Sequence, residues 1–172
     1  MTTLQKNQLE IAAIQYFIKA YPQKLKVLEH SDKPDFTLID GTNNQKIGAE
    51  IAHLYHDKKE AQILLGNSEE TIHGIMCADD LIKVLNSLIN QKTNKIKGYR
   101  SHDKSILVIR VASPIFDKST FDMHEDAIIC PKNDYDEIWL VLDGKKGKWT
   151  ELKQIKSTNI TQHGLAGSRY KL

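Results

Sequence analysis

Hydrophobic and polar residues recur with two different periods along the first third of the chain. From Gln5 to Tyr21 apolar residues repeat at helical spacing, and Pro22 follows as a stop signal. This apolar stripe consists of Leu9, Ala13, Tyr16, Phe17 and Ala20. Three β-type runs follow, KLKVLEH, PDFTLID and KIGAEIAHLY, with the turn-forming residues DGTNN between the last two. The pattern predicts a helix and then an antiparallel three-stranded meander.

The rest of the chain predicts more helices and strands. Residues 57–78 are polar and irregular, and we interpret them as an inserted loop. The segment DLIKVLNSLINQKTNKI predicts a helix, because Asp79 and Asp80 suit its start and Gly98 suits its end. SILVIRVA and DEIWLVLDG are typical of buried strands, and STFDMHEDAI of a short helix. A C-terminal extension over residues 148–172 adds one more predicted strand.

The core order α-β-β-β-α-β predicts an α/β (α+β) fold with a mixed central sheet flanked by helices. At 172 residues, one domain over residues 1–172 is the natural interpretation. No apolar run is long enough to span a membrane, and the start MTTLQKNQLE has no signal-peptide core. Two widely spaced cysteines form neither a metal-type pair nor a disulfide framework. These features predict a cytoplasmic protein without a membrane partner.

Glu50 stands in the middle of the third predicted strand, among small residues. Alternation places Gly48, Glu50, Ala52 and Leu54 on one face and Ile47, Ala49, Ile51 and His53 on the other. A carboxylate in such a place is costly unless something pairs with it. Asp35 follows Pro34 at the start of the preceding strand, so the hairpin can bring two carboxylates together. Mg²⁺ (or Mn²⁺) relieves the repulsion of such a pair through oxygen ligands.

KPDF followed by GAEIA resembles the motif of the PD-(D/E)XK superfamily, the restriction-endonuclease-like nucleases. The core of that family is a helix, a three-stranded meander, a helix and a further strand, as predicted here over roughly residues 5–142. The resemblance implies metal-dependent hydrolysis of a nucleic-acid phosphodiester, with DNA favoured over RNA. It implies that Asp35, Glu50 and the backbone carbonyl of Ile51 hold the metal. Family members often add an acidic residue from the first helix, for which Glu10 is the first candidate and Glu29 the second.

The family's lysine is missing, because its position is occupied by Ala52. Lys92 is the candidate replacement, since it interrupts the apolar stripe Leu81, Leu85, Leu88, Lys92 and Ile96 of the second long helix. A lysine there can lie along the core and extend its ammonium toward an acidic cluster. Lys95 lies nearby but less centrally. The segment INQKTNKIKGY resembles a K…Y segment of small members of the superfamily, which adds Tyr99 as a site candidate.

Each candidate also has an ordinary structural explanation. Asp35 can be a turn residue after proline, Glu50 an exposed charge on an edge strand, and Lys92 and Glu10 solvated helix residues. His53 and His56 form an H-x-x-H pattern, but on a strand they face opposite sides, which argues against a zinc site. Lys145, Lys146 and Lys148 are either phosphate contacts or solvated turn residues.

Three functions remain open from the sequence. The first is the metal-dependent nuclease. The second is a catalytically silent module of the same fold that binds nucleic acid or a protein, and the third is a small regulatory protein that reuses the fold. The net charge of +2 neither demands nor excludes a polyanionic partner. The sequence also leaves open whether the chain forms a homodimer.

Overall fold

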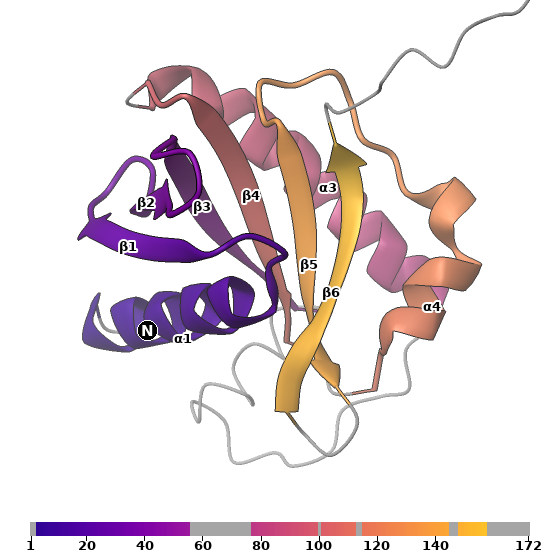
Figure 1. Cartoon of the computed structure of the whole chain (residues 1–172). Coiled ribbons are helices and arrows are strands. Elements are labelled where there is room, and N and C mark those ends of the chain that lie inside the picture. Colours follow the sequence, from indigo (N-terminus) through magenta and orange to yellow (C-terminus); the bar gives the residue numbers. More distant parts are fainter. Residues whose placement is uncertain (1–2, 56–76, 100, 113–114, 145–147, 158–172) are drawn as a thin grey trace, which may run out of the picture.

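The computed structural model describes residues 3–55, 77–99, 101–112, 115–144 and 148–157. The first elements follow the predicted α-β-β-β-α-β order (Figure 1). They are α1 (Thr3–Ala20), β1 (Leu25–His30), β2 (Phe36–Asp40), β3 (Lys46–Leu54), α3 (Ala78–Lys95) and β4 (Lys104–Val111). After them come the short helix α4 (Lys118–Met123) and the strands β5 (Glu137–Gly144) and β6 (Lys148–Ser157). Two 3₁₀ turns, η1 (Ile96–Gly98) and η2 (Glu125–Ala127), follow α3 and α4.

The six strands form one mixed sheet in the order β1-β2-β3-β4-β5-β6. β1, β2 and β3 pair antiparallel, which confirms the predicted meander. β3, β4 and β5 are parallel neighbours, and β6 returns antiparallel along β5. Because parallel neighbours need a crossover connection, the chain passes through α3 between β3 and β4. β3 is therefore a central strand, not an edge.

Two apolar clusters cover the two faces of the sheet, and both include residues of β3. α1 packs over one face through Ala13, Ile14 and Phe17, against strand residues that include Phe36, Leu38, Ile47, Ala49 and Ile51. α3 packs over the other face through Leu81, Ile82, Leu85 and Ile89, against residues that include Ala52, Leu54, Leu107 and Ile109. The structure thus has three layers, helix, sheet and helix (Figure 1). The predicted alternation along β3 is confirmed.

The predicted helices are confirmed, but the buried face of α1 differs in part from the prediction. Ala13 and Phe17 are buried as predicted, whereas Tyr16 is 39% exposed and Ala20 is also exposed. Glu10 and Ile14 take their places on the buried side. The apolar residues of α1 lie on more than one side of the helix. The packing of α1 against the sheet, and not the spacing of its apolar residues, therefore selects the buried side.

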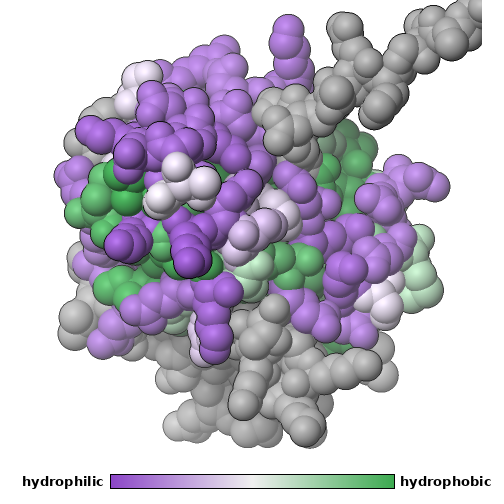
Figure 2. Space-filling view, viewed as in Figure 1, coloured by the Kyte–Doolittle hydropathy of each residue, from purple (hydrophilic) through white to green (hydrophobic). Residues whose placement is uncertain are grey.

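The surface seen in Figure 2 is mainly hydrophilic, with separate apolar areas between the polar side chains. Large exposed apolar residues include Ile11 and Tyr16 on α1 and Val27 and Leu28 on β1. Scattered apolar residues of this kind are usual on a protein surface. Within the described ranges, no helix has both the length and the apolar character needed to cross a membrane.

Candidate active site

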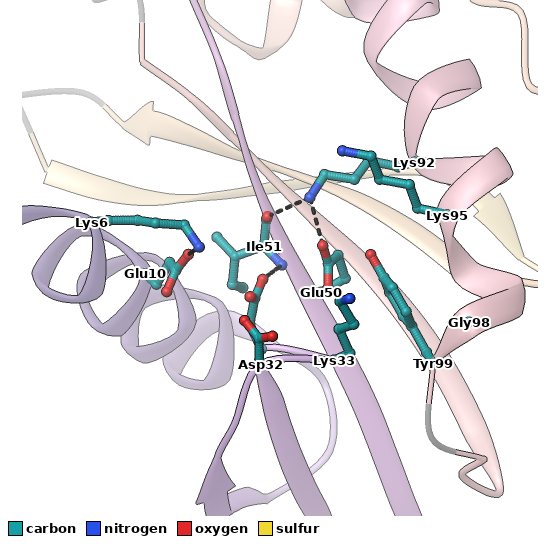
Figure 3. Close-up of a pocket in the computed structure, with 11 residues that line it drawn as sticks. Lys6, Glu10, Asp32, Lys33, Glu50, Ile51, Lys92, Lys95, Gly98 and Tyr99 are labelled. Carbon is teal, nitrogen blue, oxygen red and sulfur yellow. Dashed lines mark hydrogen bonds and ion pairs between the residues drawn. The ribbon is translucent and has the colours of Figure 1, made fainter. Parts of the chain in front are cut away.

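A pocket of about 510 Å³ opens where α1, the turn before β2, β3 and the end of α3 meet (Figure 3). Its lining contains four acidic and four lysine side chains, so their formal charges balance. They are Glu10, Asp32, Asp35 and Glu50, and Lys6, Lys33, Lys92 and Lys95. Ile51, Gly98 and Tyr99 complete the lining. Many of these groups are candidates that the sequence placed far apart along the chain.

Asp35 and Glu50 are brought together as predicted. Phe36 pairs with Ala49, so one step further along this antiparallel register Asp35 comes level with Glu50. Each residue is only 6% exposed. Burial, reinforced by the Glu50 charge, raises the pKa of Asp35 to about 7, although the Ile51 N–H donates to Asp35 Oδ2 at 2.7 Å and opposes this rise. The pair therefore has the crowded negative charge that a cation would relieve.

Lys92 extends from α3 to Glu50 and to the backbone of Ile51 (Figure 3). Its Nζ lies 2.6 Å from Glu50 Oε1 and donates to the Ile51 carbonyl oxygen at 3.2 Å. Only 15% of the lysine side chain is exposed. Ala52, two residues beyond Glu50 on the same face, is buried in the cluster under α3. Lys92 thus brings an ammonium group from α3 to the face of β3 that carries Ala52, which itself has no charge.

α1 contributes a second charged pair to the pocket. Glu10 is 4% exposed, and its carboxylate lies 3.0 Å from Lys6 Nζ and 3.6 Å from His30 Nε2. The ordinary explanation of Glu10 as a solvated helix residue is therefore wrong. Glu29, the second acidic candidate, is exposed and lines a different pocket. Of the two, only Glu10 shares a pocket with Asp35 and Glu50.

Two tyrosines stand beside the carboxylates, and the sequence indicated only one of them. Tyr99 lines the pocket next to Glu50, and burial, a hydrogen bond to the Glu50 carboxylate and the Glu50 charge raise the pKa of Tyr99 well above its ordinary value. Behind it, Tyr135 is 2% exposed, and burial raises the pKa of Tyr135 in the same direction. Both hydroxyls therefore keep their protons at neutral pH. Tyr135 lies just before β5 without a local pattern that marks it, so only tertiary packing reveals its place.

The residues that the sequence proposed as metal ligands offer a suitable set of donor atoms. Asp35, Glu50 and the Ile51 carbonyl all present oxygen, the donor that Mg²⁺ and Mn²⁺ prefer. Lys92 occupies Glu50 Oε1, whereas Oε2 is buried with no close hydrogen bond from the described residues, and the Tyr99 hydroxyl is the group that interacts with this carboxylate from the pocket side. Among the residues that the structure describes, no three His, Cys, Asp or Glu side chains are grouped around a common metal position. Any metal here would rest on two carboxylates and a carbonyl.

The remaining candidates lie elsewhere or outside the described residues. His53 alternates to the opposite face of β3 from Glu50, and burial followed by the nearby Arg110 charge lowers the pKa of His53 to about 4. His56, Lys145, Lys146 and most of the loop at 57–78 lie outside the described residues, as does the side chain of Lys148. The phosphate-contact hypothesis for the lysines therefore stays a prediction, and the H-x-x-H pattern, against which the strand alternation argues, is not tested.

His102 contacts β2 and β3 close to the residues that carry the carboxylate pair. Its Nε2 is 2.9 Å from Thr37 Oγ1, and its ring lies over Gly48, the β3 residue two positions before Glu50. A Cβ at position 48 would come 2.9 Å from His102 Nδ1 and 3.0 Å from Pro34 Cγ. Position 48 therefore requires glycine for close packing.

Gly48→Ala is expected to destabilise the protein by about 1–3 kcal/mol, because overpacking displaces the imidazole. Urea unfolding measures the change. Gly98→Ala is the control, since a Cβ at position 98 meets no atom within 4 Å. Equal stability of the two variants would show that the His102 ring moves aside without cost.

Comparisons of the chain with models of protein families, with curated proteins and with solved structures find no match. The geometry of this pocket is therefore the basis on which a function can be proposed.

Proposed function

We propose that this chain is a divalent-metal-dependent nuclease with a restriction-endonuclease-like core of the PD-(D/E)XK type. Its substrate is a nucleic-acid phosphodiester, and DNA is favoured over RNA. One observation carries the proposal: Asp35 from the turn before β2, Glu50 from β3 and Lys92 from α3 converge in a single pocket. The order α1-β1-β2-β3-α3-β4 supports it, because the sequence resemblance implies the same order.

Each residue has a distinct role in the proposed reaction. Asp35, Glu50 and the Ile51 carbonyl would hold Mg²⁺, which when bound supplies charge stabilisation and water activation. The Lys92 ammonium would contact a phosphoryl oxygen, where negative charge grows in the transition state. Glu10, paired with Lys6, borders the same pocket and would orient groups on the α1 side.

The charge balance of the pocket favours a polyanion only after a cation is added. Four lysines already offset four carboxylates. A divalent cation would leave the pocket with an excess of two positive charges and would attract a phosphate backbone. Lys33 is exposed and lines the pocket, so it is placed to contact phosphates on either side of the cleaved bond.

Two measurements test the proposal. The wild type is expected to bind Mn²⁺ in calorimetry and to cleave plasmid DNA, single-stranded DNA or RNA in Mg²⁺ but not in EDTA. Glu50→Gln is expected to weaken Mn²⁺ binding by about tenfold or more and to abolish cleavage. Glu137→Gln is a matched control, because Glu137 is also buried and lies 2.6 Å from a lysine, Lys104, outside the pocket.

A catalytically silent binding module is the second candidate. The observation that favours it is that Lys92 already bonds to two of the proposed metal-binding groups, Glu50 and Ile51. A wild type that binds nucleic acid equally well in Mg²⁺ and EDTA, and cleaves none of the substrates, would support this candidate over the nuclease.

A further inference from the structure

The Lys92 ammonium lies where a metal ion would be expected. It contacts a carboxylate oxygen of Glu50 at 2.6 Å and the Ile51 carbonyl oxygen at 3.2 Å. These are two of the three groups proposed to hold the divalent cation, and Asp35, the third, lies level with Glu50 and lines the same pocket as Lys92. A magnesium ion would need ligand distances of about 2.1 Å to the same oxygens. An ammonium and a metal ion cannot both occupy this space, because their positive charges would be almost in contact.

We infer that Lys92 is an internal counter-ion that holds the place of the divalent cation, and that it leaves Glu50 for the phosphate group of the substrate when the cation binds. This inference rests on the proposed metal site. The four-carbon stem of lysine permits such a movement without displacement of α3. The buried Glu50 would remain paired in both states, first with Lys92 and then with the metal.

Two consequences follow for binding. The cation alone binds weakly, since it must first displace a close ion pair. A phosphodiester strengthens cation binding, because its charge offers the displaced ammonium a new partner. The coupling is reciprocal, so the cation strengthens phosphodiester binding by the same factor. Lys92 would therefore make the site complete only when metal and nucleic acid are both present.

Mn²⁺ titration of Lys92→Met and Lys95→Met by calorimetry tests the inference. Methionine keeps much of the apolar stem of lysine and removes its charge. Both lysines lie near the end of α3 and line the same pocket, so both variants remove one positive charge from it. Lys92→Met is expected to bind Mn²⁺ about tenfold or more tightly than the wild type, a typical size for a coupled equilibrium. Lys95→Met is expected to change the affinity by less than about threefold, which is the effect of a charge near the site but not in it.

Chemical labelling of the wild type provides a second, independent measurement. Acetic anhydride acylates accessible amines, and peptide mass spectrometry reads each lysine separately. Lys92 is expected to react slowly without metal, because its amine is held by Glu50, and faster when Mg²⁺ is present. Lys95, which is exposed, serves as the internal control and is expected to react at the same rate in both conditions.

The outcomes separate the inference from the proposed function. If the wild type binds Mn²⁺ but Lys92→Met binds it equally or more weakly, the counter-ion inference is overturned and the metal site survives. Equal strengthening in both methionine variants would also overturn it, as a general charge effect. If neither the wild type nor Lys92→Met binds Mn²⁺, the metal site itself is lost, and the inference with it.

Discussion

Lys92→Met is expected to reduce Mg²⁺-dependent cleavage by about 10²-fold or more, the usual size of losing one group that stabilises transition-state charge. The same variant is expected to bind the metal more tightly. The two effects have one cause, because the ammonium that competes with the cation in the free protein neutralises the phosphoryl oxygens during the reaction. Ala52 cannot replace it, since its side chain carries no charge and is buried under α3.

Cleavage of a labelled oligonucleotide under single-turnover conditions measures this effect, and circular dichroism verifies the fold. Lys95→Met is the matched control and should retain activity within a few-fold. An active wild type that is indifferent to Lys92→Met would remove Lys92 from the site. Loss of activity together with loss of helical signal would instead indicate that the Lys92–Glu50 ion pair is needed for folding, and Lys92→Arg, which preserves the charge, would then test the catalytic role.

Asp35→Asn is expected to stabilise the metal-free protein at pH 7.5 by about 2–4 kcal/mol relative to the wild type. In the folded protein, burial and the Glu50 charge raise the pKa of Asp35 to about 7 from an ordinary value of 3.8. The folded state therefore holds this proton more tightly than the unfolded state. The resulting stability is fully present below pH 3.8 and is lost as pH rises through 7. Asparagine removes the charge and can still accept the N–H of Ile51.

Urea unfolding in EDTA at several pH values between 4.5 and 7.5 measures this effect as the difference between wild type and variant at each pH. The comparison with the variant is needed because His53 changes the stability with pH in the opposite direction. The pKa of His53 is lowered to about 4 in the folded protein, so its contribution to stability is lost as pH falls below 6.5. Asp40→Asn is the control, since Asp40 is buried at the other end of β2 and does not line the pocket. A constant difference between wild type and Asp35→Asn across this range would contradict the raised pKa.

The same titration also tests the metal site. If Asp35 and Glu50 bind a cation together, Mn²⁺ should restore stability to the wild type at pH 7.5, because it stabilises only the folded state. Asp35→Asn should gain less. Equal gains in both proteins would show that Asp35 is not a ligand, whatever its pKa.

The helices, strands and face alternation could be predicted because they depend on local periodicity. The strict two-residue alternation in KIGAEIAHL placed Glu50 and Ala52 on one face of β3 and Ile51 on the other, and both clusters confirm this. Lys92 interrupts the apolar stripe of α3. This pattern placed the lysine on the side of the helix that faces the sheet. For α1 the local pattern was less informative, and the predicted burial of Tyr16 was wrong.

Contacts between distant segments could not be predicted in this way. Lys6, Asp32 and Lys33 carry ordinary surface charges in the sequence, yet they line the pocket because α1 and the turn before β2 meet beside β3. Tyr135 reaches the site only because β5 pairs parallel with β4 and brings the preceding loop near Tyr99. Such pairings depend on long-range packing, about which neighbouring residues carry no information.

The sequence by itself therefore determined the layered α/β architecture, the meander, and the two carboxylates on neighbouring strands with a lysine facing them. The tertiary structure alone decided that Glu10 is buried, that Glu29 is excluded, and that the Lys92 ammonium contacts Glu50 and Ile51. The physical reason is that a clear period, as in β3 and α3, indicates which side of an element is buried. The distance between two charges depends instead on how the elements pack, and a change of a few ångströms separates an ion pair from a solvated lysine.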